Sequence, residues 1–317
     1  MKKTGVVLLN MGGPDSLDAV EPFLYNLFSD HDIIQIPRLI QKPIAKIISK
    51  FRSKSTRKYY QIMGGKSPQK EQTLKQAKAL QEKLGDRYKV VVAMRYWHPF
   101  TDEALEKLKD EDIDKIVLLP LYPQFSTTTT GSSLNEFFKH LKKFQEQGYF
   151  KNVEIKVINS YHSEPWYIQS MVENIKQHLP DYKEYFFLFS AHSLPVSVIK
   201  KGDPYKDQTN ETVKLIMEHF PNNKYQLAFQ SKVGPVKWLE PFTDEVIKQL
   251  AKQEIKKLAV IPVSFVSEHS ETLYELDYLY GNLAKEYGIE NYKRIPTLQT
   301  HPTFIEGLKK LVNASER

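Results

Sequence analysis

Short apolar runs alternate with longer amphipathic segments along the whole chain. The apolar runs predict β-strands at residues 5–9, 89–93, 115–119, 153–157, 185–189, 225–229 and 257–261. Apolar residues at helical spacing predict helices at residues 16–28, 68–84, 101–110, 131–147, 164–179, 205–219, 241–252, 269–286 and 302–312. Because most of these strands are apolar on both faces and are followed by helices, the pattern indicates an α/β fold with parallel sheets covered on both sides.

The chain contains an internal repeat. Residues 99–120 read PFTDEALEKLKDEDIDKIVLLP, and residues 241–262 read PFTDEVIKQLAKQEIKKLAVIP, so the two segments align without a gap. Amphipathic helix–strand units resemble one another in general, but the shared PFTDE run favours a true duplication. We therefore expect two similar doubly wound domains, at residues 1–165 and 166–317.

Composition narrows the class of protein. The chain has 317 residues, of which 41% are hydrophobic and 26% charged, and its apolar runs are too short for a transmembrane helix. The apolar start is broken by Asn10 and Asp15, which argues against a signal peptide and favours a cytoplasmic protein. The absence of cysteine excludes disulfides, thiolate catalysis and cysteine-held metal clusters, so metal chemistry must use His, Asp or Glu.

The net charge of +7 is concentrated in one segment. No acidic residue lies between Asp32 and Glu71, and an apolar helical face is predicted within this interval beside Lys42, Lys46 and Lys50. The residues of that face are Ile40, Ile44, Ile47, Ile48 and Phe51. Such a helix suits an anionic membrane surface or the mouth of a pocket for an acidic ligand, or it is an ordinary surface helix packed on a domain. No nucleic-acid-binding motif accompanies the charge, so we expect no nucleic-acid partner.

The loops that follow the predicted strands carry the candidate chemistry, because ligands of parallel sheets bind beyond the carboxyl ends of the strands. The loop at residues 10–14 lacks the GxGxxG spacing of a dinucleotide site. The hydroxyl-rich loop at residues 122–133 suits a carboxylate or phosphate, or simply caps the helix that follows.

Two further loops bring a histidine and carboxylates to the same sheet edge. His192 follows one predicted strand, and Glu268, Glu271 and Glu275 follow the strand that ends near Pro262, at a spacing that lines them along one helix face. His192 and Glu271 are therefore expected to converge. One imidazole with carboxylates and no thiols suits a loosely held divalent metal, with Glu268 and Glu275 nearby as helpers or as a path for ions and protons. A structural histidine and a solvated acidic helix face remain the alternatives.

Several long motifs resemble those of the ferrochelatases, and together they span the chain in order. They are LLNMGGPDS from Leu8, MRYWHPFT from Met94, LYPQFSTTTTGSS from Leu121, FLFSAHSLPVSVIKKGDPY from Phe187, QSKVGPVKWLEPFTDE from Gln230 and SEHSETLYELD from Ser267.

The resemblance implies two Rossmann-like domains with a porphyrin cleft between them. It also implies a lyase that inserts ferrous iron into protoporphyrin IX, the last step of haem synthesis. By motif, His192 and Glu271 bind iron and take the pyrrole protons, with His269, Glu268 and Glu275 around the metal. The implied porphyrin contacts are Met11, Tyr60, Ser67, Arg95, Tyr96 and Tyr122, with Arg95 paired to a propionate. Ferrous iron is a substrate, and no resident cofactor or iron–sulfur cluster is expected.

Alternative functions remain open from the sequence. One is a chelatase with another substrate, such as coproporphyrin III or another tetrapyrrole. A non-catalytic haem or metal carrier would need the histidine but not the carboxylates. The sequence predicts no oligomeric state. We expect the segment at residues 33–70 to form a lip of the cleft and to contact anionic membranes reversibly.

Overall fold

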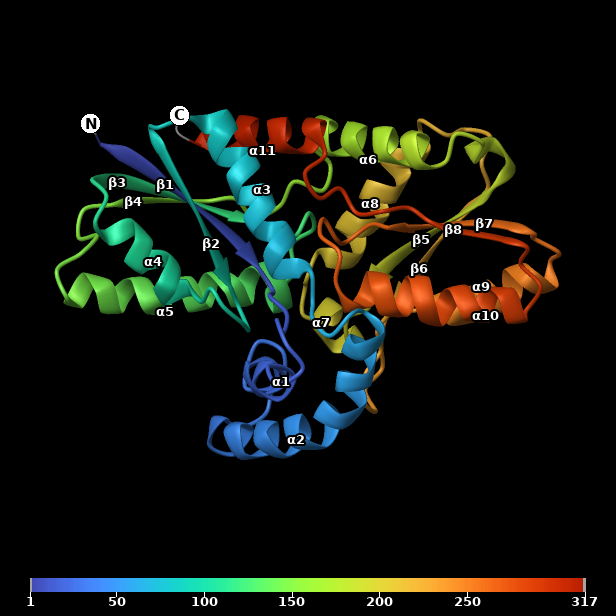
Figure 1. Cartoon of the computed structure of the whole chain (residues 1–317), viewed down its shortest axis with the longest axis horizontal. Coiled ribbons are helices and arrows are strands. Elements are labelled where there is room, and N and C mark those ends of the chain that lie inside the picture. Colours follow the sequence, from blue (N-terminus) through green and yellow to red (C-terminus); the bar gives the residue numbers. More distant parts are fainter. Residues whose placement is uncertain (1, 316–317) are drawn as a thin grey trace. The chain divides into compact units, whose positions relative to one another are not determined.

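The computed structural model describes residues 2–315 and divides the chain into two compact units (Figure 1). The first holds the chain up to Ser160 together with the segment from Ile305 onward, and the second is Tyr161–Phe304. The predicted division at residue 165 had assigned the whole C-terminal segment to the second domain. The difference arises because helix α11 (Pro302–Ser315) meets the first unit, where the Tyr88 hydroxyl donates to Asn313 Oδ1 at 3.1 Å.

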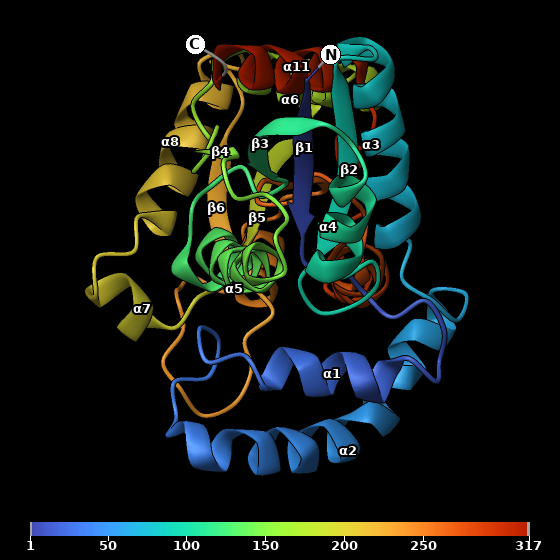
Figure 2. The ribbon, with the colours of Figure 1, turned by 90° about the vertical axis from the view of Figure 1, so that its left-hand side faces the viewer.

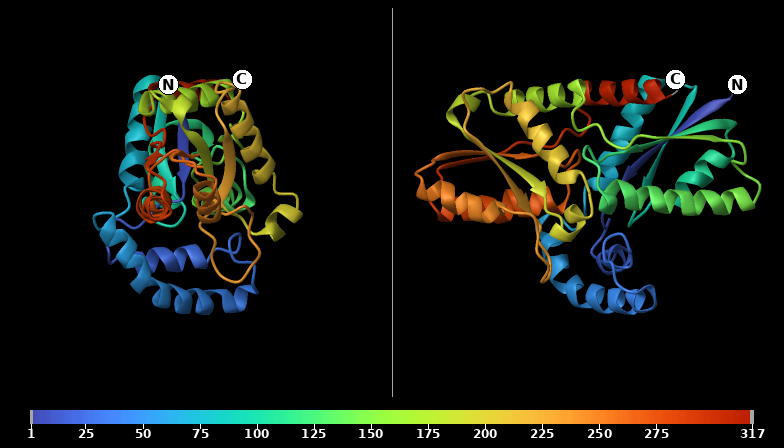
Figure 3. Two further views of the ribbon diagram at one scale, coloured as in Figure 1. Left: turned by 90° about the vertical axis from the view of Figure 1, so that its right-hand side faces the viewer. Right: turned by 180° about the vertical axis from the view of Figure 1, so that it is seen from behind.

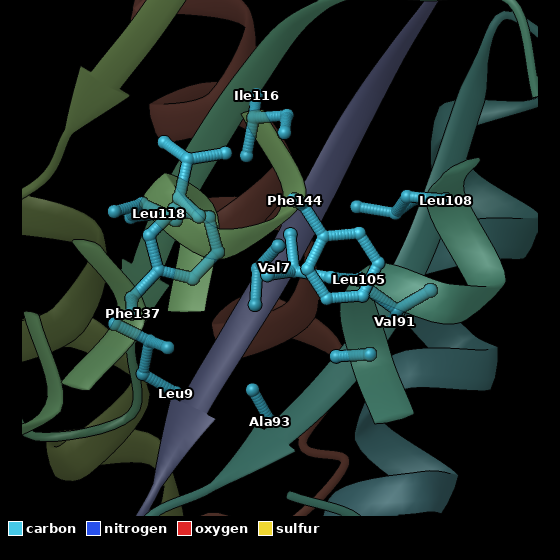
Figure 4. Close-up of a cluster of buried hydrophobic side chains, with 12 residues drawn as sticks. Val7, Leu9, Val91, Ala93, Leu105, Leu108, Ile116, Leu118, Phe137 and Phe144 are labelled. Atoms are coloured by element: carbon cyan, nitrogen blue, oxygen red, sulfur yellow. The ribbon is translucent and has the colours of Figure 1, made fainter. Parts of the chain in front are cut away.

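The first unit is built on a four-stranded parallel sheet in the order β2-β1-β3-β4. Its strands are β1 (Lys3–Asn10), β2 (Tyr88–Met94), β3 (Ile113–Pro120) and β4 (Glu154–Val157). Its helices are α1 (Val20–Phe28), α2 (Arg38–Ile62), α3 (Gln69–Leu84), α4 (Thr101–Lys109), the π-helix η1 (Thr127–Gly131) and α5 (Ser132–Glu146). Buried side chains of β1 to β3 pack against α4 and α5 to form one core, and Figure 4 shows Phe137 and Phe144 over Val7.

The second unit repeats this arrangement with the order β6-β5-β7-β8. Its strands are β5 (Phe186–His192), β6 (Tyr225–Gln230), β7 (Lys257–Pro262) and β8 (Asn291–Arg294). Its helices are α6 (Pro165–His178), the 3₁₀-helix η2 (Tyr182–Glu184), α7 (Val196–Lys200), α8 (Tyr205–Met217), α9 (Thr243–Lys252), the π-helix η3 (Glu271–Tyr280) and α10 (Gly281–Glu286). Helix α8 covers one face of the sheet and α9 and α10 cover the other (Figure 3).

The two units share more than strand order. In each, the third strand along the chain leads into a π-helix that continues as an α-helix, as β3–η1–α5 and as β7–η3–α10. The carbonyl of each repeated proline also accepts from the end of a neighbouring strand, Pro99 from Met94 at 2.7 Å and Pro241 from Phe229 at 2.8 Å. The predicted α/β fold with two similar doubly wound units is confirmed.

Most predicted elements are present, and two of the differences bear on the second unit's sheet edge. Strand β8 was not predicted, because its residues NYKR are polar and none of them is buried. The helix predicted at residues 269–286 is a π-helix over Glu271–Tyr280. Apolar spacing does not distinguish a π-helix from an α-helix over so short a segment.

Helices α1 and α2 lie beyond the carboxyl end of β1 (Figure 2). They pack on each other through α1 residues such as Phe23 and through Ala45 and Tyr60 of α2. The buried face of α2 otherwise consists of Gln41, Ser49 and Ser53.

The apolar face predicted for the basic segment is therefore largely exposed. Ile40, Ile47 and Phe51 are 48%, 57% and 78% exposed, and Leu39 is 94% exposed, whereas Ile44 and Ile48 are half-buried. Helix α2 packs on its own unit through Ile48 and leaves Leu39, Ile40, Ile47 and Phe51 exposed. Within residues 2–315, no helix is long and apolar enough to cross a membrane.

Candidate functional site

His192 is the last residue of β5, a central strand of the second sheet. Its backbone is fixed on both sides, since its N–H donates to Ser264 Oγ at 3.0 Å and its carbonyl accepts from the Tyr205 hydroxyl at 2.9 Å. Its side chain is 33% exposed. The imidazole therefore stands at the carboxyl edge of the sheet on a rigid support.

Glu271, the first residue of η3, meets this imidazole. The distance from His192 Nδ1 to Glu271 Oε2 is 2.8 Å, which confirms the convergence expected from the two strand ends. Burial lowers the pKa of His192, but the charge of Glu271, its hydrogen bond to the ring and the charge of Glu275 together outweigh this effect, so the pKa lies above its usual value. Burial raises the pKa of Glu271, but the charge and hydrogen bond of His192, with smaller contributions from His269 and Ser231, together outweigh this effect, so the pKa falls. The two side chains form an ion pair whenever the imidazole is protonated.

Glu275 lies next to Glu271 on η3, and two consecutive residues from the end of β6 hold both. The Ser231 hydroxyl is 3.0 Å from Glu271 Oε2 and 2.6 Å from Glu275 Oε2. Gln230 Nε2 donates to the Glu271 carbonyl at 2.9 Å and to Glu275 Oε2 at 3.2 Å. Burial and the neighbouring charge of Glu271 raise the pKa of Glu275 to about 7. The sequence had marked the motif around Gln230 and Ser231 but given neither residue a role.

Glu268 has a different environment from the one predicted for it. It precedes η3, and its Oε1 accepts from Arg294 Nη1 at 2.6 Å and from the Thr297 N–H at 2.9 Å. Burial raises its pKa, but the charge of Arg294 and the hydrogen bonds that Glu268 accepts together lower it by more. The predicted line of three carboxylates is therefore reduced to Glu271 and Glu275. The physical reason is the unpredicted strand β8, which ends at Arg294 and supplies a cation for Glu268.

His269 is buried beside the same carboxylate. Its Nε2 is 3.7 Å from Glu271 Oε1, and its ring contacts the edge of Phe265, with 4.4 Å between ring centroids. Burial lowers the pKa of His269, although Glu271 partly opposes this effect. His269 is thus a neutral imidazole that packs near Glu271, whereas His192 is the histidine that pairs with it.

Glu275 also borders a cavity within the second unit. This cavity of about 460 Å³ is lined by Ser231, Glu275 and further charged side chains. Those charged residues are Lys232, Asp244, Lys248 and Glu286. In the described part of the chain, no three His, Asp or Glu side chains are arranged to hold a metal ion.

Arg95 and Tyr96, predicted as porphyrin contacts, belong to a network in the first unit. Asp30 Oδ2 accepts from the Tyr96 hydroxyl at 2.6 Å and pairs with Arg95 Nη2 at 3.0 Å, and Arg95 Nε donates to Ser132 Oγ at 2.7 Å. The charge of Arg95 is thus already balanced by Asp30, which is buried. Asp30 was not predicted as a site residue, since a single acid after a helix carries no distinguishing pattern.

The remaining predicted porphyrin contacts also lie in the first unit. Met11 and Tyr60 pack into the same apolar cluster as Tyr96, next to α1. Ser67 is buried against Gly13, where a Cβ atom would lie 2.5 Å from Ser67 Oγ, so the glycine is required for this approach. Tyr122 is half-buried, and burial raises the pKa of its hydroxyl.

Comparison with known proteins identifies the family. The family model described as Ferrochelatase matches residues 3–316. A ferrochelatase of Sulfurihydrogenibium sp. is 68% identical, and one of Aquifex aeolicus is 60% identical, each over 98% of both chains. Among solved structures, SirB from Bacillus subtilis with Fe3+ has a TM-score of 0.61 at 11% identity, covering 99% of this chain and 95% of that one. The last likeness shows the fold alone.

Proposed function

Because this chain belongs to the ferrochelatase family, whose members insert iron into a porphyrin, we propose that His192 and Glu271 carry out this insertion and that the porphyrin is protoporphyrin IX. The observation that supports the residue roles is the 2.8 Å contact between His192 Nδ1 and Glu271 Oε2 at the edge of the second sheet.

Metallation requires the pyrrole nitrogens to lose their protons while the iron loses water. With Nδ1 hydrogen-bonded to Glu271, the Nε2 atom of His192 is the ring nitrogen left to accept a pyrrole proton. The negative charge of Glu271 stabilises the resulting imidazolium, which is the effect that raises the pKa of His192. The same imidazole and carboxylate would serve as transient ligands of ferrous iron, which must be held weakly enough to be released to the porphyrin.

We propose that Glu275 acts as an outlet for protons or an inlet for the ion. It touches Ser231, which also contacts Glu271, and it borders the cavity that contains Asp244 and Glu286. A carboxyl group whose pKa is about 7 exchanges protons readily near neutral pH. Glu268 has no part in this path, because Arg294 holds it.

The proposed porphyrin contacts are the apolar cluster of Met11, Tyr60 and Tyr96, with Ser67 and Tyr122. Flat hydrophobic rings are gripped by aromatic and methionine side chains. Arg95, expected to meet a propionate, is paired with Asp30. This pairing favours the porphyrin with fewer carboxylates, which is protoporphyrin IX rather than coproporphyrin III.

Assaying the purified protein with ferrous iron and each porphyrin tests this choice. We expect kcat/KM for protoporphyrin IX to exceed that for coproporphyrin III by about tenfold or more, the effect of one mismatched charged contact. A higher kcat/KM for coproporphyrin III would overturn the substrate assignment. Tight porphyrin binding without metallation would instead indicate a carrier.

We also propose that this enzyme works in the cytoplasm and contacts the inner face of the membrane reversibly through α2. Its exposed apolar residues Leu39, Ile47 and Phe51 lie on the same helix as the exposed Lys42, Lys46 and Lys50. Two weak contributions favour membrane binding. One is the burial of these apolar side chains, and the other is roughly 1 kcal/mol for each basic residue near an anionic surface. Contact with a membrane would help the enzyme to collect a poorly soluble porphyrin.

Co-sedimentation with liposomes measures this contact. The protein should pellet with vesicles that contain anionic lipid, and added salt should release it, because the lysine contribution is screened. Replacing both Ile47 and Phe51 with Ser should reduce the bound fraction severalfold, since each loses its apolar burial. Leu74→Ser, at a 43% exposed leucine of α3, is the matched control. A protein that stays in the supernatant with anionic vesicles would refute the proposal.

A further inference from the structure

Ser231 has a backbone conformation that serine rarely adopts. Its φ angle is +67°, in the left-handed region that favours glycine, and it directly follows the last residue of β6. Serine in this region costs free energy relative to glycine. Such a conformation persists only when surrounding contacts hold it, and it occurs often at functional sites.

The contacts that hold Ser231 are those of its hydroxyl group. Ser231 Oγ lies 2.6 Å from Glu275 Oε2 and 3.0 Å from Glu271 Oε2. A hydroxyl has a single hydrogen, so it donates to one carboxylate at a time. The Glu271 Oε2 atom that it reaches is the same atom that faces His192 Nδ1.

The preceding residue fixes the orientation of this bridge. The Gln230 side chain is buried, and its Oε1 accepts from the Ser190 hydroxyl at 2.6 Å. Its Nε2 is therefore turned toward η3, where it donates to the Glu271 carbonyl and to Glu275. The end of β6 is thus pinned to the first turn of η3 by two adjacent side chains.

The first unit has a contact of the same kind. Arg95 directly follows β2, the edge strand that corresponds to β6, and its Nε donates to Ser132 Oγ, at the residue that directly follows η1. In the first unit, the residue just past the edge strand therefore binds the residue that follows the π-helix, and in the second unit it binds the first residue of the π-helix. The second unit differs in placing a small hydroxyl group there, where it fits between two carboxylates.

We propose that Ser231 is a positioning residue for iron insertion, which holds the Glu271 carboxylate in contact with His192 and links it to Glu275. This inference rests on the proposed roles of His192 and Glu271. Without the hydroxyl, Glu271 Oε2 keeps only its contact with His192, and its carboxylate is free to turn away from the imidazole. The left-handed backbone conformation of Ser231 is unfavourable in free energy, but it directs the hydroxyl group toward both carboxylates.

Three substitutions separate the hydroxyl group from the backbone. Ser231→Gly removes the hydroxyl and relieves the backbone, so we expect a Tm above that of Ser231→Ala and a kcat about tenfold below that of the wild type, the effect of losing a hydrogen bond to a charged group. Ser231→Ala removes the hydroxyl without that relief and should lower kcat to the same extent. Ser231→Thr keeps the hydroxyl and worsens the backbone, so it should lower Tm and retain kcat within about threefold. KM for the porphyrin should be unchanged in all three.

Ring ¹⁵N NMR of His192 in the protein without substrates provides a readout that does not depend on turnover. The Nδ1 resonance should move in the Gly and Ala variants and stay in place in the Thr variant. Ser163→Gly, in the turn before α6, is the matched control and should change neither readout. Activity that follows Tm across the series, or an unmoved Nδ1 resonance in Ser231→Gly, would overturn the inference. Wild-type protein that inserts no iron would count against the proposed function, while the NMR result would still decide the role of Ser231.

Discussion

Replacing His192 with alanine is expected to lower kcat for iron insertion by about 10³-fold, within the range for removal of a general base, and to leave the fold intact. The imidazole is the group proposed to receive the pyrrole protons, and its Nδ1 is held by Glu271. The ring is partly exposed at a strand end, so removing it leaves no large cavity in a core.

Loss of porphyrin fluorescence on metallation measures kcat, and thermal unfolding followed by circular dichroism measures Tm. We expect Tm to change by no more than about 4 °C, the effect of roughly 1 kcal/mol in a protein of this size. His162→Ala is the matched control, because His162 pairs with the exposed Glu211 at 2.9 Å in the same unit. Near-normal turnover by the His192→Ala variant would show that His192 does not take part in the mechanism.

Glu271→Gln should lower kcat by about 10²-fold, and Glu275→Gln should have a smaller effect, of about tenfold at most. Glu271 carries the charge that stabilises protonated His192, whereas Glu275 reaches Glu271 only through the Ser231 hydroxyl. Equal losses in the two variants, or a larger loss in Glu275→Gln, would contradict this order. Glu290→Gln, at an exposed residue that faces Lys256, is the control for removal of a surface carboxylate.

The pH dependence of kcat should also distinguish the Glu275→Gln variant from the Glu271→Gln variant. Because the pKa of Glu275 is raised to about 7, this side chain is mostly neutral at pH 6 and mostly charged at pH 8. Glutamine resembles the neutral acid, so Glu275→Gln should match the wild type at pH 6 and fall below it at pH 8. No such difference is expected for Glu271→Gln, since the pKa of Glu271 is low and its carboxylate is charged at both values.

The contribution of Glu275 to the stability of the folded protein should fall as pH rises, whereas its contribution to activity should increase. Between about pH 4.5 and pH 7 the unfolded chain ionises Glu275 and the folded chain does not, so this group's contribution to stability falls as pH rises through that window. Glu275→Gln removes the effect. The variant should therefore be more stable than the wild type at pH 8, by about 3 kcal/mol at most, and similar to it at pH 4.

The periodicity of the sequence by itself determined the α/β class, the strands from β1 to β7 and the duplication. Buried parallel strands are continuous apolar runs, and helices carry a distinct spacing, so both leave a local signal. The motifs determined the family, and the rule that parallel strands end at one edge was enough to bring His192 to Glu271.

Only the tertiary structure decided which carboxylates lie together. Glu268, Glu271 and Glu275 have the same side chain and a regular spacing in the sequence. In the structure, Glu268 instead pairs with Arg294, which lies on a polar strand that has no apolar pattern. Ser231 entered the proposed site through a positive φ and through contacts to residues forty and forty-four positions away, which no local pattern records. The exposed face of α2 likewise depends on the tertiary structure, because α1 covers the other side of the helix. An apolar stripe in the sequence does not show what it packs against.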